Sequence, residues 1–215
     1  MTFQDRYDAG RRLAQALEQY RDEDPVILGL PRGGVVVAYE IARSLAAPLD
    51  VLVVRKLGAP GAQEFAIGAI APGATLLSRN LVAGLRVPRE YLARIIAREA
   101  DELARRELVY RGTRGPLEVE GRTVILVDDG LATGATAQAA VESLRRRGPK
   151  KIVFAAPVCS ADGAKALEEV ADAVVCLECP ADFGAVGYWY RDFSPTTDAE
   201  VIECLLATEA RRIPA

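Results

Sequence analysis

The chain has 215 residues, a length that suits one α/β domain with a small appendage better than two large domains. Half of its residues are hydrophobic, which is enough for a chain of this size to build a core without disulfide or metal staples. The absence of histidine excludes Ser-His-Asp and Cys-His triads, His-ligated zinc and histidine proton shuttles. The 27 basic and 30 acidic residues give a net charge of −3, which argues against a dedicated nucleic-acid binder.

The sequence predicts neither secretion nor a membrane span. Its first residues lack a basic segment followed by an apolar one, and no run approaches about 18 uncharged apolar residues. We therefore expect a cytoplasmic protein. Among four cysteines in the last third of the chain, Cys176 and Cys179 form a C-x-x-C pair without a second pair nearby. We interpret the cysteines as small hydrophobic residues, with a redox or metal role as the alternative.

Apolar runs alternate with amphipathic stretches along the chain, and this alternation is typical of βαβ units around a mainly parallel sheet. For the first half of the chain the pattern predicts a helix over 4–20, a strand over 26–30, a helix from 33 to about 45, a strand over 50–54, an irregular stretch over 55–61 and an apolar segment over 65–72. For the second half it predicts a helix from 88 to about 110, a strand over 123–127, a helix ending near 147, a strand over 151–158, a helix over 161–170, a strand over 173–178 and a helix from 198 to about 210.

The predicted fold is α/β, with a mainly parallel, Rossmann-like sheet flanked by helices and a small C-terminal hood. We expect residues 1–178 to form the core, with the long helix inserted in it, and residues 179–215 to form the hood, which is not an independent domain. Four apolar residues of the long helix are spaced so that they could line one face: Tyr91, Ile95, Leu103 and Leu108. Asp198 is expected to be the N-cap of the last helix.

The most informative segment runs from Val124 to Thr136. Its apolar strand ends in two adjacent carboxylates, Asp128 and Asp129, and a loop of small residues then opens a helix. Such a loop offers backbone N–H groups, threonine hydroxyls and the positive end of a helix dipole to one phosphate. The twin acids would repel a phosphate directly. They suit a ligand that also presents hydroxyls or Mg²⁺, and a ribose 5-phosphate offers both kinds of group.

This segment resembles the phosphoribosyl pyrophosphate motif of the type I phosphoribosyltransferases, in which a hydrophobic run precedes two acids and a T-G-x-T loop. The resemblance implies the fold of that family. It also implies that Asp128 and Asp129 contact the ribose 2- and 3-hydroxyls and hold Mg²⁺ indirectly, through those hydroxyls or water. The implied 5-phosphate loop consists of Ala132, Thr133, Gly134, Ala135 and Thr136. The alternative is that the segment has only a structural role, as a strand-turn-helix in which the acids and threonines cap the helix.

A second loop also follows an apolar strand and opens a helix, so both loops should lie at the carboxyl edge of one sheet, where α/β proteins bind ligands. It consists of Pro31, Arg32, Gly33 and Gly34. This loop resembles the pyrophosphate loop of the same family, in which a basic residue before glycine meets the leaving group. The resemblance implies that Arg55 and Lys56 also reach pyrophosphate, and that Arg32 and Lys56 share the catalytic work with the acids. The alternatives are that Pro-Arg-Gly-Gly is an ordinary turn and that Arg55-Lys56 is the solvated end of a strand.

The resemblance implies a Mg²⁺-dependent pentosyltransferase of nucleotide metabolism, which moves the 5-phosphoribosyl group from phosphoribosyl pyrophosphate to a nitrogenous base and releases pyrophosphate. Ala132 stands where many members that act on 6-oxopurines carry a third acid, so hypoxanthine and guanine are disfavoured. The family implies a homodimer whose partners are the donor and a small base, with no nucleic acid polymer and no membrane. The alternative is a non-catalytic regulator that binds phosphoribosyl pyrophosphate or a nucleotide.

Aromatic residues crowd into residues 183–193, near the carboxyl terminus. Aromatic faces stack on planar bases, so Phe183, Trp189 and Tyr190 are candidates for binding the acceptor. The alternative is that they pack the hood or a subunit interface. Residues 57–64 and 111–116 are candidates for a lid, because a reactive oxocarbenium-like centre requires the exclusion of water.

Overall fold

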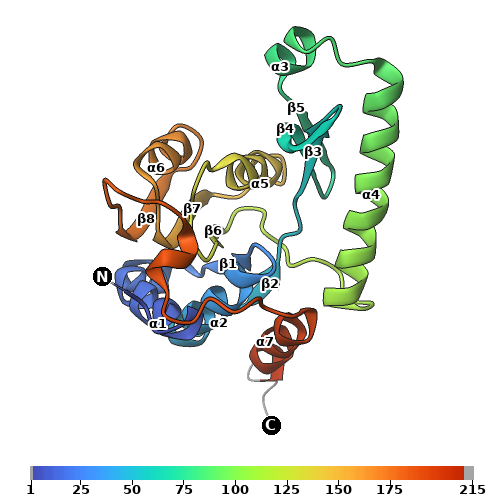
Figure 1. The fold of residues 1–215 in the computed structure, drawn as a ribbon. Coiled ribbons are helices and arrows are strands. Elements are labelled where there is room, and N and C mark those ends of the chain that lie inside the picture. The colour runs from blue at the N-terminus through green and yellow to red at the C-terminus, as the bar shows by residue number, and fades with distance from the viewer. Residues whose placement is uncertain (1, 211–215) are drawn as a thin grey trace.

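A five-stranded parallel sheet with the strands β1 (Val26–Gly29), β2 (Leu49–Val51), β6 (Thr123–Val127), β7 (Lys151–Val158) and β8 (Ala173–Glu178) forms the centre of the molecule (Figure 1). The computed structural model describes residues 2–210, apart from the side chain of Glu64. The strand order is β2-β1-β6-β7-β8, and every pairing is parallel. All carboxyl ends therefore lie at one edge of the sheet, which confirms the predicted fold class.

Helices pack on the two faces of the sheet: α1 (Arg6–Ala16), α2 (Gly33–Leu45), α5 (Ala135–Arg145), α6 (Ala161–Glu168) and α7 (Asp198–Ala210). Successive residues of one strand point to opposite faces, so the sheet contributes to two cores. Ile27 and Ile125 pack with α1, α2 and α7, whereas Leu28 and Leu126 pack with α5 and α6. Every residue of β1 and β6 is buried, as expected for parallel strands covered on both faces. Within residues 2–210, every helix is too short or too polar to span a bilayer.

An arm stands beside the core and consists of β3 (Arg55–Ala59), β4 (Ala62–Ala71), β5 (Ala74–Leu77), α3 (Arg79–Gly84) and α4 (Arg89–Arg111) (Figure 1). The prediction of an irregular stretch over 55–61 is wrong, because these residues form β3 and the turn into β4, an antiparallel hairpin. Glycines let the arm strands approach closely. A Cβ on Gly58 would lie 2.5 Å from the carbonyl oxygen of Gln63, and one on Gly68 would lie 2.3 Å from that of Leu76. The lid candidate 57–64 therefore belongs to an antiparallel hairpin, whose register shifts on either side of Gly58.

Four expectations for helices and cysteines need correction. Leu108 does not line the buried face of α4, since 64% of it is exposed, whereas Ile95 and Leu103 are buried. Asp198 begins α7 but does not cap it. Thr197 accepts a hydrogen bond from the backbone N–H of Glu200, whose carboxylate accepts one from the N–H of Thr197, which makes a capping box. Cys179 is exposed, unlike the buried Cys159 and Cys204. The first helix also ends earlier than predicted, at Ala16, and the 3-10 helix η1 (Glu18–Glu23) follows it.

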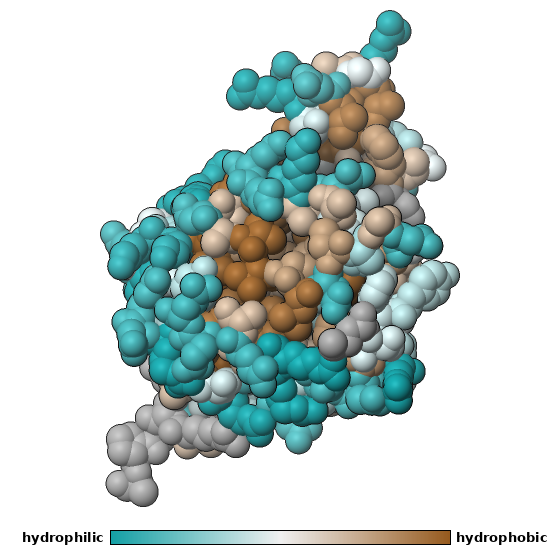
Figure 2. Space-filling view, turned by 90° about the vertical axis from the view of Figure 1, so that its left-hand side faces the viewer, coloured by the Kyte–Doolittle hydropathy of each residue, from teal (hydrophilic) through white to brown (hydrophobic). Residues whose placement is uncertain are grey.

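One lateral edge of the sheet is only partly covered. β8 is the last strand in the order, and all six of its residues are half-buried. Its sequence, Ala-Val-Val-Cys-Leu-Glu, is mainly apolar. Figure 2, which views the molecule from this side, shows hydrophobic residues gathered in the middle of the face. The single chain thus leaves apolar surface open along this strand.

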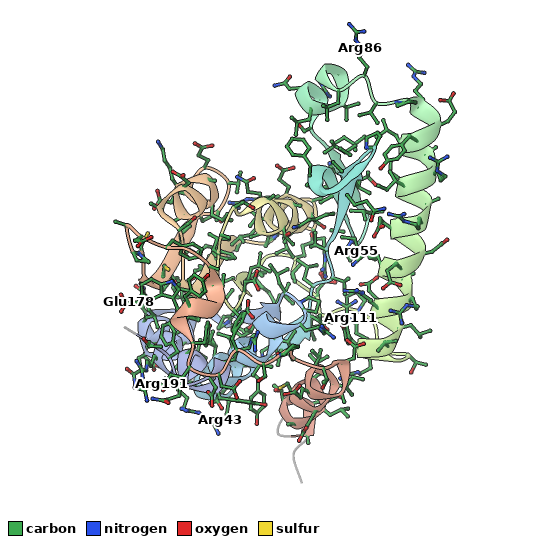
Figure 3. The ribbon with its side chains drawn as sticks, in the orientation of Figure 1. Arg43, Arg55, Arg86, Arg111, Glu178 and Arg191 are labelled. Atoms are coloured by element: carbon green, nitrogen blue, oxygen red, sulfur yellow. The ribbon has the colours of Figure 1, made fainter. Side chains whose placement is uncertain are left out.

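A buried ion pair joins the arm to the core. Arg111, the last residue of α4, donates from Nε to Asp50 Oδ1 and Oδ2 at 2.9 and 3.0 Å (Figure 3 labels Arg111). Asp50 lies in β2 and also accepts hydrogen bonds from the backbone N–H groups of Val51 and Leu117, at 2.7 and 3.1 Å. Both side chains of the pair are buried. The carboxylate therefore anchors the end of the arm helix and the loop that follows it.

Replacing Asp50 by asparagine should lower the free energy of unfolding by about 3 kcal/mol, because it leaves the Arg111 guanidinium buried with Glu107 as its one remaining carboxylate partner among residues 2–210. Urea unfolding of the variant measures this loss. The control is Glu209→Gln, which removes the exposed partner of Arg114 and should change stability by less than about 1 kcal/mol. An Asp50→Asn variant as stable as the control would contradict the anchoring role.

Candidate active site at the carboxyl edge of the sheet

The two loops singled out in the sequence lie against each other. They leave β1 and β6, which are neighbouring parallel strands with Gly29 opposite Val127. The backbone N–H of Leu30 donates to the carbonyl of Val127 at 2.8 Å, so the first loop begins in contact with the end of the second strand. The loop that begins at Pro31 leads into α2, and Asp128 follows β6. The peptide bond between Pro31 and Arg32 is cis.

Glycine is required at positions 33 and 34 because the loops touch there. A Cβ on Gly33 would lie 1.9 Å from Oδ2 of Asp129. A Cβ on Gly34 would lie 2.7 Å from the carbonyl oxygen of Val127 and 2.8 Å from Cα of Asp128. At position 34 a larger residue fits only if one of the loops moves, whereas at position 33 it fits only if the side chains of Asp129 and Arg6 shift. The two glycines therefore allow the two predicted ligand-binding loops to lie in direct contact.

The two carboxylates are held side by side among protein atoms. Oδ1 of Asp128 accepts a hydrogen bond from the backbone N–H of Asp129 at 2.9 Å. Burial, followed by the neighbouring charge of Asp129, raises the pKa of Asp128 well above its ordinary value. Burial also raises the pKa of Asp129, but the guanidinium of Arg6 opposes that shift. The pair is thus asymmetric: Arg6 forms its ion pair with Asp129, and at Asp128 its charge only partly offsets the effect of burial.

Arg6 is the site residue that sequence reasoning missed. Its Nε donates to Oδ2 of Asp129 at 2.7 Å, and its Nη1 donates to the carbonyl of Ser194 at 2.8 Å. The guanidinium lies 4.0 Å from the centre of the Phe193 ring, and only 11% of the side chain is exposed. No motif marks Arg6, because it is the first residue of an ordinary amphipathic helix and lies more than a hundred positions from its partner.

The predicted 5-phosphate loop, residues 132–136, is open to solvent at the amino end of α5. Ala132, Thr133 and Ala135 are exposed. Gly134 has φ 76°, a left-handed conformation that favours glycine, and no side chain caps the helix that follows. The first backbone N–H groups of α5 therefore remain available to an anion. The hydroxyl of Ser160 donates to the carbonyl of Ala132 and fixes the outer side of the loop.

The predicted basic residues have different surroundings. Arg32 and Lys56 are exposed, and no salt bridge to an acid is found for either within residues 2–210. Arg55 instead donates from Nε and Nη2 to Oε2 of Glu99 in α4, at 2.9 and 2.7 Å. Figure 3 shows Arg55 at the base of the arm, between β3 and α4. The structure therefore joins Arg55 to the arm helix, whereas Arg32 and Lys56 are free to meet a ligand.

The first part of the predicted hood, residues 183–193, packs on the acid pair from the side opposite Gly33, whereas α7, which the prediction also placed in the hood, packs in the core on the sheet. A Cβ on Gly130 would lie 2.3 Å from Cγ1 of Val186, a residue of the 3-10 helix η2 (Val186–Trp189). The hydroxyl of Tyr190 donates to the carbonyl of Asp129 at 2.6 Å, and burial raises the pKa of this phenol. The hood thus touches Asp129 of the predicted ribose site and the glycine that follows it.

The aromatic residues of the hood divide into two groups. Tyr190 is only 6% exposed, and its ring packs against those of Phe3 and Phe193, with centroids 5.4 and 4.9 Å apart. The expectation that Tyr190 stacks on an acceptor does not fit this placement. Phe183 and Trp189 are half-buried and, with Tyr188, line a pocket of about 350 Å³. These two rings therefore remain candidates for stacking.

The acid pair suits a magnesium ion that arrives with its substrate. Within the described part of the chain, no group of three or more His, Cys, Asp or Glu lies close enough together to hold a metal ion. Mg²⁺ at phosphate-transfer sites is usually bound through one or two carboxylates together with substrate oxygens and waters. The two carboxylates fit that kind of site, and they do not form a metal cage of their own.

Comparisons with known proteins point to one family. Residues 3–191 match the phosphoribosyl transferase domain family. Over 204 residues the chain is 47% identical to a protein of Mycobacterium tuberculosis (strain ATCC 25618 / H37Rv) with the provisional name phosphoribosyl transferase. That match covers 94% of this chain and 46% of the other protein, so the chain spans about half the length of the curated relatives it matches.

A shorter match and a solved structure extend this finding. Over 53 residues the chain is 45% identical to the uracil phosphoribosyltransferase of Geobacillus kaustophilus (strain HTA426), a match that covers 25% of each chain. The crystal structure of TT1426 from Thermus thermophilus superposes with a TM-score of 0.84 and 46% identity. It covers 96% of this chain and 99% of the other, so the two chains share one fold throughout.

Proposed function

This chain belongs to the phosphoribosyl transferase domain family, and we propose that it transfers the 5-phosphoribosyl group of phosphoribosyl pyrophosphate to a nitrogenous base and releases pyrophosphate. The observation that carries the proposal is the contact between the two loops. An acid pair and a Gly-Gly loop meet at one sheet edge, where a ligand with hydroxyls and a polyphosphate could touch both.

The donor would bind across both loops and the amino end of α5. In the proposal, Asp128 and Asp129 accept hydrogen bonds from the ribose hydroxyls, and residues 132–136 hold the 5-phosphate through backbone N–H groups and the hydroxyls of Thr133 and Thr136. The exposed loop and the uncapped helix support this placement. The carboxylates also lie where they would favour the positive charge that develops on the ribose.

The leaving group would meet the first loop. Exposed Arg32 and Lys56 supply cations, and the backbone of Gly33 and Gly34 allows a pyrophosphate to approach closely. When bound, Mg²⁺ would neutralise part of the pyrophosphate charge. Arg55 is paired with Glu99. In the proposal it reaches the donor only after it is released from that carboxylate.

The acceptor would bind beneath the hood. Val186 packs on Gly130, directly after the acid pair, so the hood adjoins the predicted ribose site. Half-buried Phe183 and Trp189 could offer their rings to a planar base. Ala132 provides no carboxylate for a proton on a purine ring, so we propose that 6-oxopurines are poor acceptors. We also propose a homodimer, and the partly covered β8 edge is consistent with it.

The test is an assay of pyrophosphate release. The protein is incubated with Mg²⁺, phosphoribosyl pyrophosphate and a panel of purines, pyrimidines and related amines. We expect release with at least one acceptor, and weak or no release with hypoxanthine and guanine. A variant with both Asp128→Asn and Asp129→Asn is the control for contaminating activity. Tight donor binding without release from any acceptor would contradict catalysis and favour a non-catalytic regulator.

A further inference from the structure

Arg6 connects three parts of the molecule that the sequence keeps far apart. It begins α1, its Nε pairs with Oδ2 of Asp129 at 2.7 Å, and its Nη1 donates to the carbonyl of Ser194 at 2.8 Å. The ring of Phe193 covers one face of the guanidinium at 4.0 Å. A Cβ on Gly33 would lie 2.5 Å from its Nε, so the cation also lies against the Gly-Gly loop.

These contacts fix the position of the Asp129 carboxylate. Arg6 engages Oδ2, and the backbone carbonyl of the same residue accepts a hydrogen bond from the hydroxyl of Tyr190 at 2.6 Å. Among residues 2–210, no other residue donates a hydrogen bond to Oδ1 of Asp129, and the remaining donor near the carboxylate is the backbone N–H of Asp129 itself. One carboxylate oxygen is therefore held by a cation, and the other can accept a hydrogen bond from a ligand.

Building on the proposed function, we propose that Arg6 is a positioning residue for the donor: it holds Asp129 so that Oδ1 accepts a hydrogen bond from a ribose hydroxyl. Arg6 itself touches Asp129 and the hood, and acts on the ribose only through the carboxylate. The side chain is suited to this task because its planar guanidinium donates in two directions and stacks on an aromatic ring. A lysine ammonium keeps the charge but cannot make all three contacts.

The test measures binding by calorimetry, with Mg²⁺ present, of two probes, phosphoribosyl pyrophosphate and ribose 5-phosphate. We expect Arg6→Met to weaken both by about ten- to a hundredfold, because a charge-assisted hydrogen bond loses its fixed acceptor. Arg6→Lys should recover part of the loss. Arg11→Met is the matched control, since Arg11 lies on the same helix with half of its side chain exposed, and it should bind as the unmodified protein does.

A double-mutant cycle separates positioning from a structural effect. If Arg6 acts through Asp129, Arg6→Met should change donor affinity by less than about twofold in the Asp129→Asn background, because the coupled group is already lost. Independent losses that multiply would overturn the proposal. In turnover assays, the KM for the donor should rise in Arg6→Met while the KM for the acceptor stays constant.

The two probes also separate this proposal from the one on which it rests. If the unmodified protein binds neither probe, the proposed function fails. If it binds both and Arg6→Met binds them equally well, only the role of Arg6 fails. A variant that loses affinity for phosphoribosyl pyrophosphate but keeps it for ribose 5-phosphate would also overturn the proposal, because Arg6 would then act on the pyrophosphate.

Discussion

Asp128→Asn and Asp129→Asn should each weaken donor binding by about ten- to a hundredfold, and the double variant by more, because a neutral amide is a poorer acceptor for a ribose hydroxyl. The two substitutions should nevertheless have opposite effects on stability. This contrast follows from the asymmetry of the pair, since only Asp129 has Arg6 as a counter-ion. Calorimetric titration with the donor and thermal unfolding without it measure the two effects.

Asp128→Asn should raise the melting temperature at neutral pH. Burial and the charge of Asp129 raise the pKa of Asp128 in the folded state above its unfolded value. The stability that this proton contributes is complete below the unfolded pKa and is lost as the pH rises through the folded pKa. As the pH rises above the unfolded pKa this contribution is lost, so at neutral pH an ionisable carboxyl at this position costs stability. Asparagine removes that cost and keeps an oxygen for the N–H of Asp129.

Asp129→Asn should instead lower the melting temperature. Burial raises the pKa of Asp129 too, so asparagine also relieves some cost there, but we expect the loss of the Arg6 ion pair, which leaves a mostly buried guanidinium without its carboxylate, to outweigh that gain. Asp101→Asn, at an exposed position of α4, is the control for both measurements and should change neither. Donor binding that is unchanged in Asp128→Asn and Asp129→Asn would contradict the ribose site. A fall in stability for Asp128→Asn would contradict the asymmetry of the pair.

The sequence predicts the parts of this site that are local in the chain. The strand before Asp128 and the loop after it form one continuous motif, and the second loop has the same strand-loop-helix order. Because carboxyl ends of parallel strands share an edge, the predicted fold class places both loops at one edge, whereas their direct contact depends on β1 and β6 being neighbouring strands. The sequence also predicts the long helix to within about one residue at each end, since α4 runs from Arg89 to Arg111, although the periodicity places Leu108 on the wrong face.

Contacts between distant segments could not be predicted in this way. Arg6 and Asp129 are neighbours only because α1 packs beneath the hood. The arm strands escaped prediction because Gly58 and Gly68 meet backbone atoms of adjacent strands, and such contacts leave no alternation of apolar and polar residues. The pairing of Arg55 likewise depends on where α4 folds back across β3.

The second large effect is expected from Gly33→Ala, which should weaken donor binding by about a hundredfold or more while the protein stays folded. The new methyl group would lie within 2.5 Å of Arg6 Nε and closer still to Oδ2 of Asp129. Both are ends of side chains, which can move away at modest cost. The substitution would therefore break the Arg6 to Asp129 contact and shift the carboxylate, and both events should lower affinity for the ribose.

Gly34→Ala should behave differently, because its methyl group would meet backbone atoms, the carbonyl oxygen of Val127 and Cα of Asp128. Backbone cannot yield as a side chain can, so this variant should lose about 1–3 kcal/mol of stability as well as donor affinity. Gly84→Ala is the control. An added Cβ there would meet no atom within 4 Å beyond its chain neighbours and its own helix, so this variant should retain both stability and donor affinity. Comparing Gly33→Ala and Gly34→Ala with Gly84→Ala shows whether donor binding requires close contact between the two loops or only the presence of their ligand-binding groups. If Gly33→Ala binds the donor as tightly as the unmodified protein does, the acid pair can move without loss of donor affinity. The close contact between the loops would then not be required for donor binding.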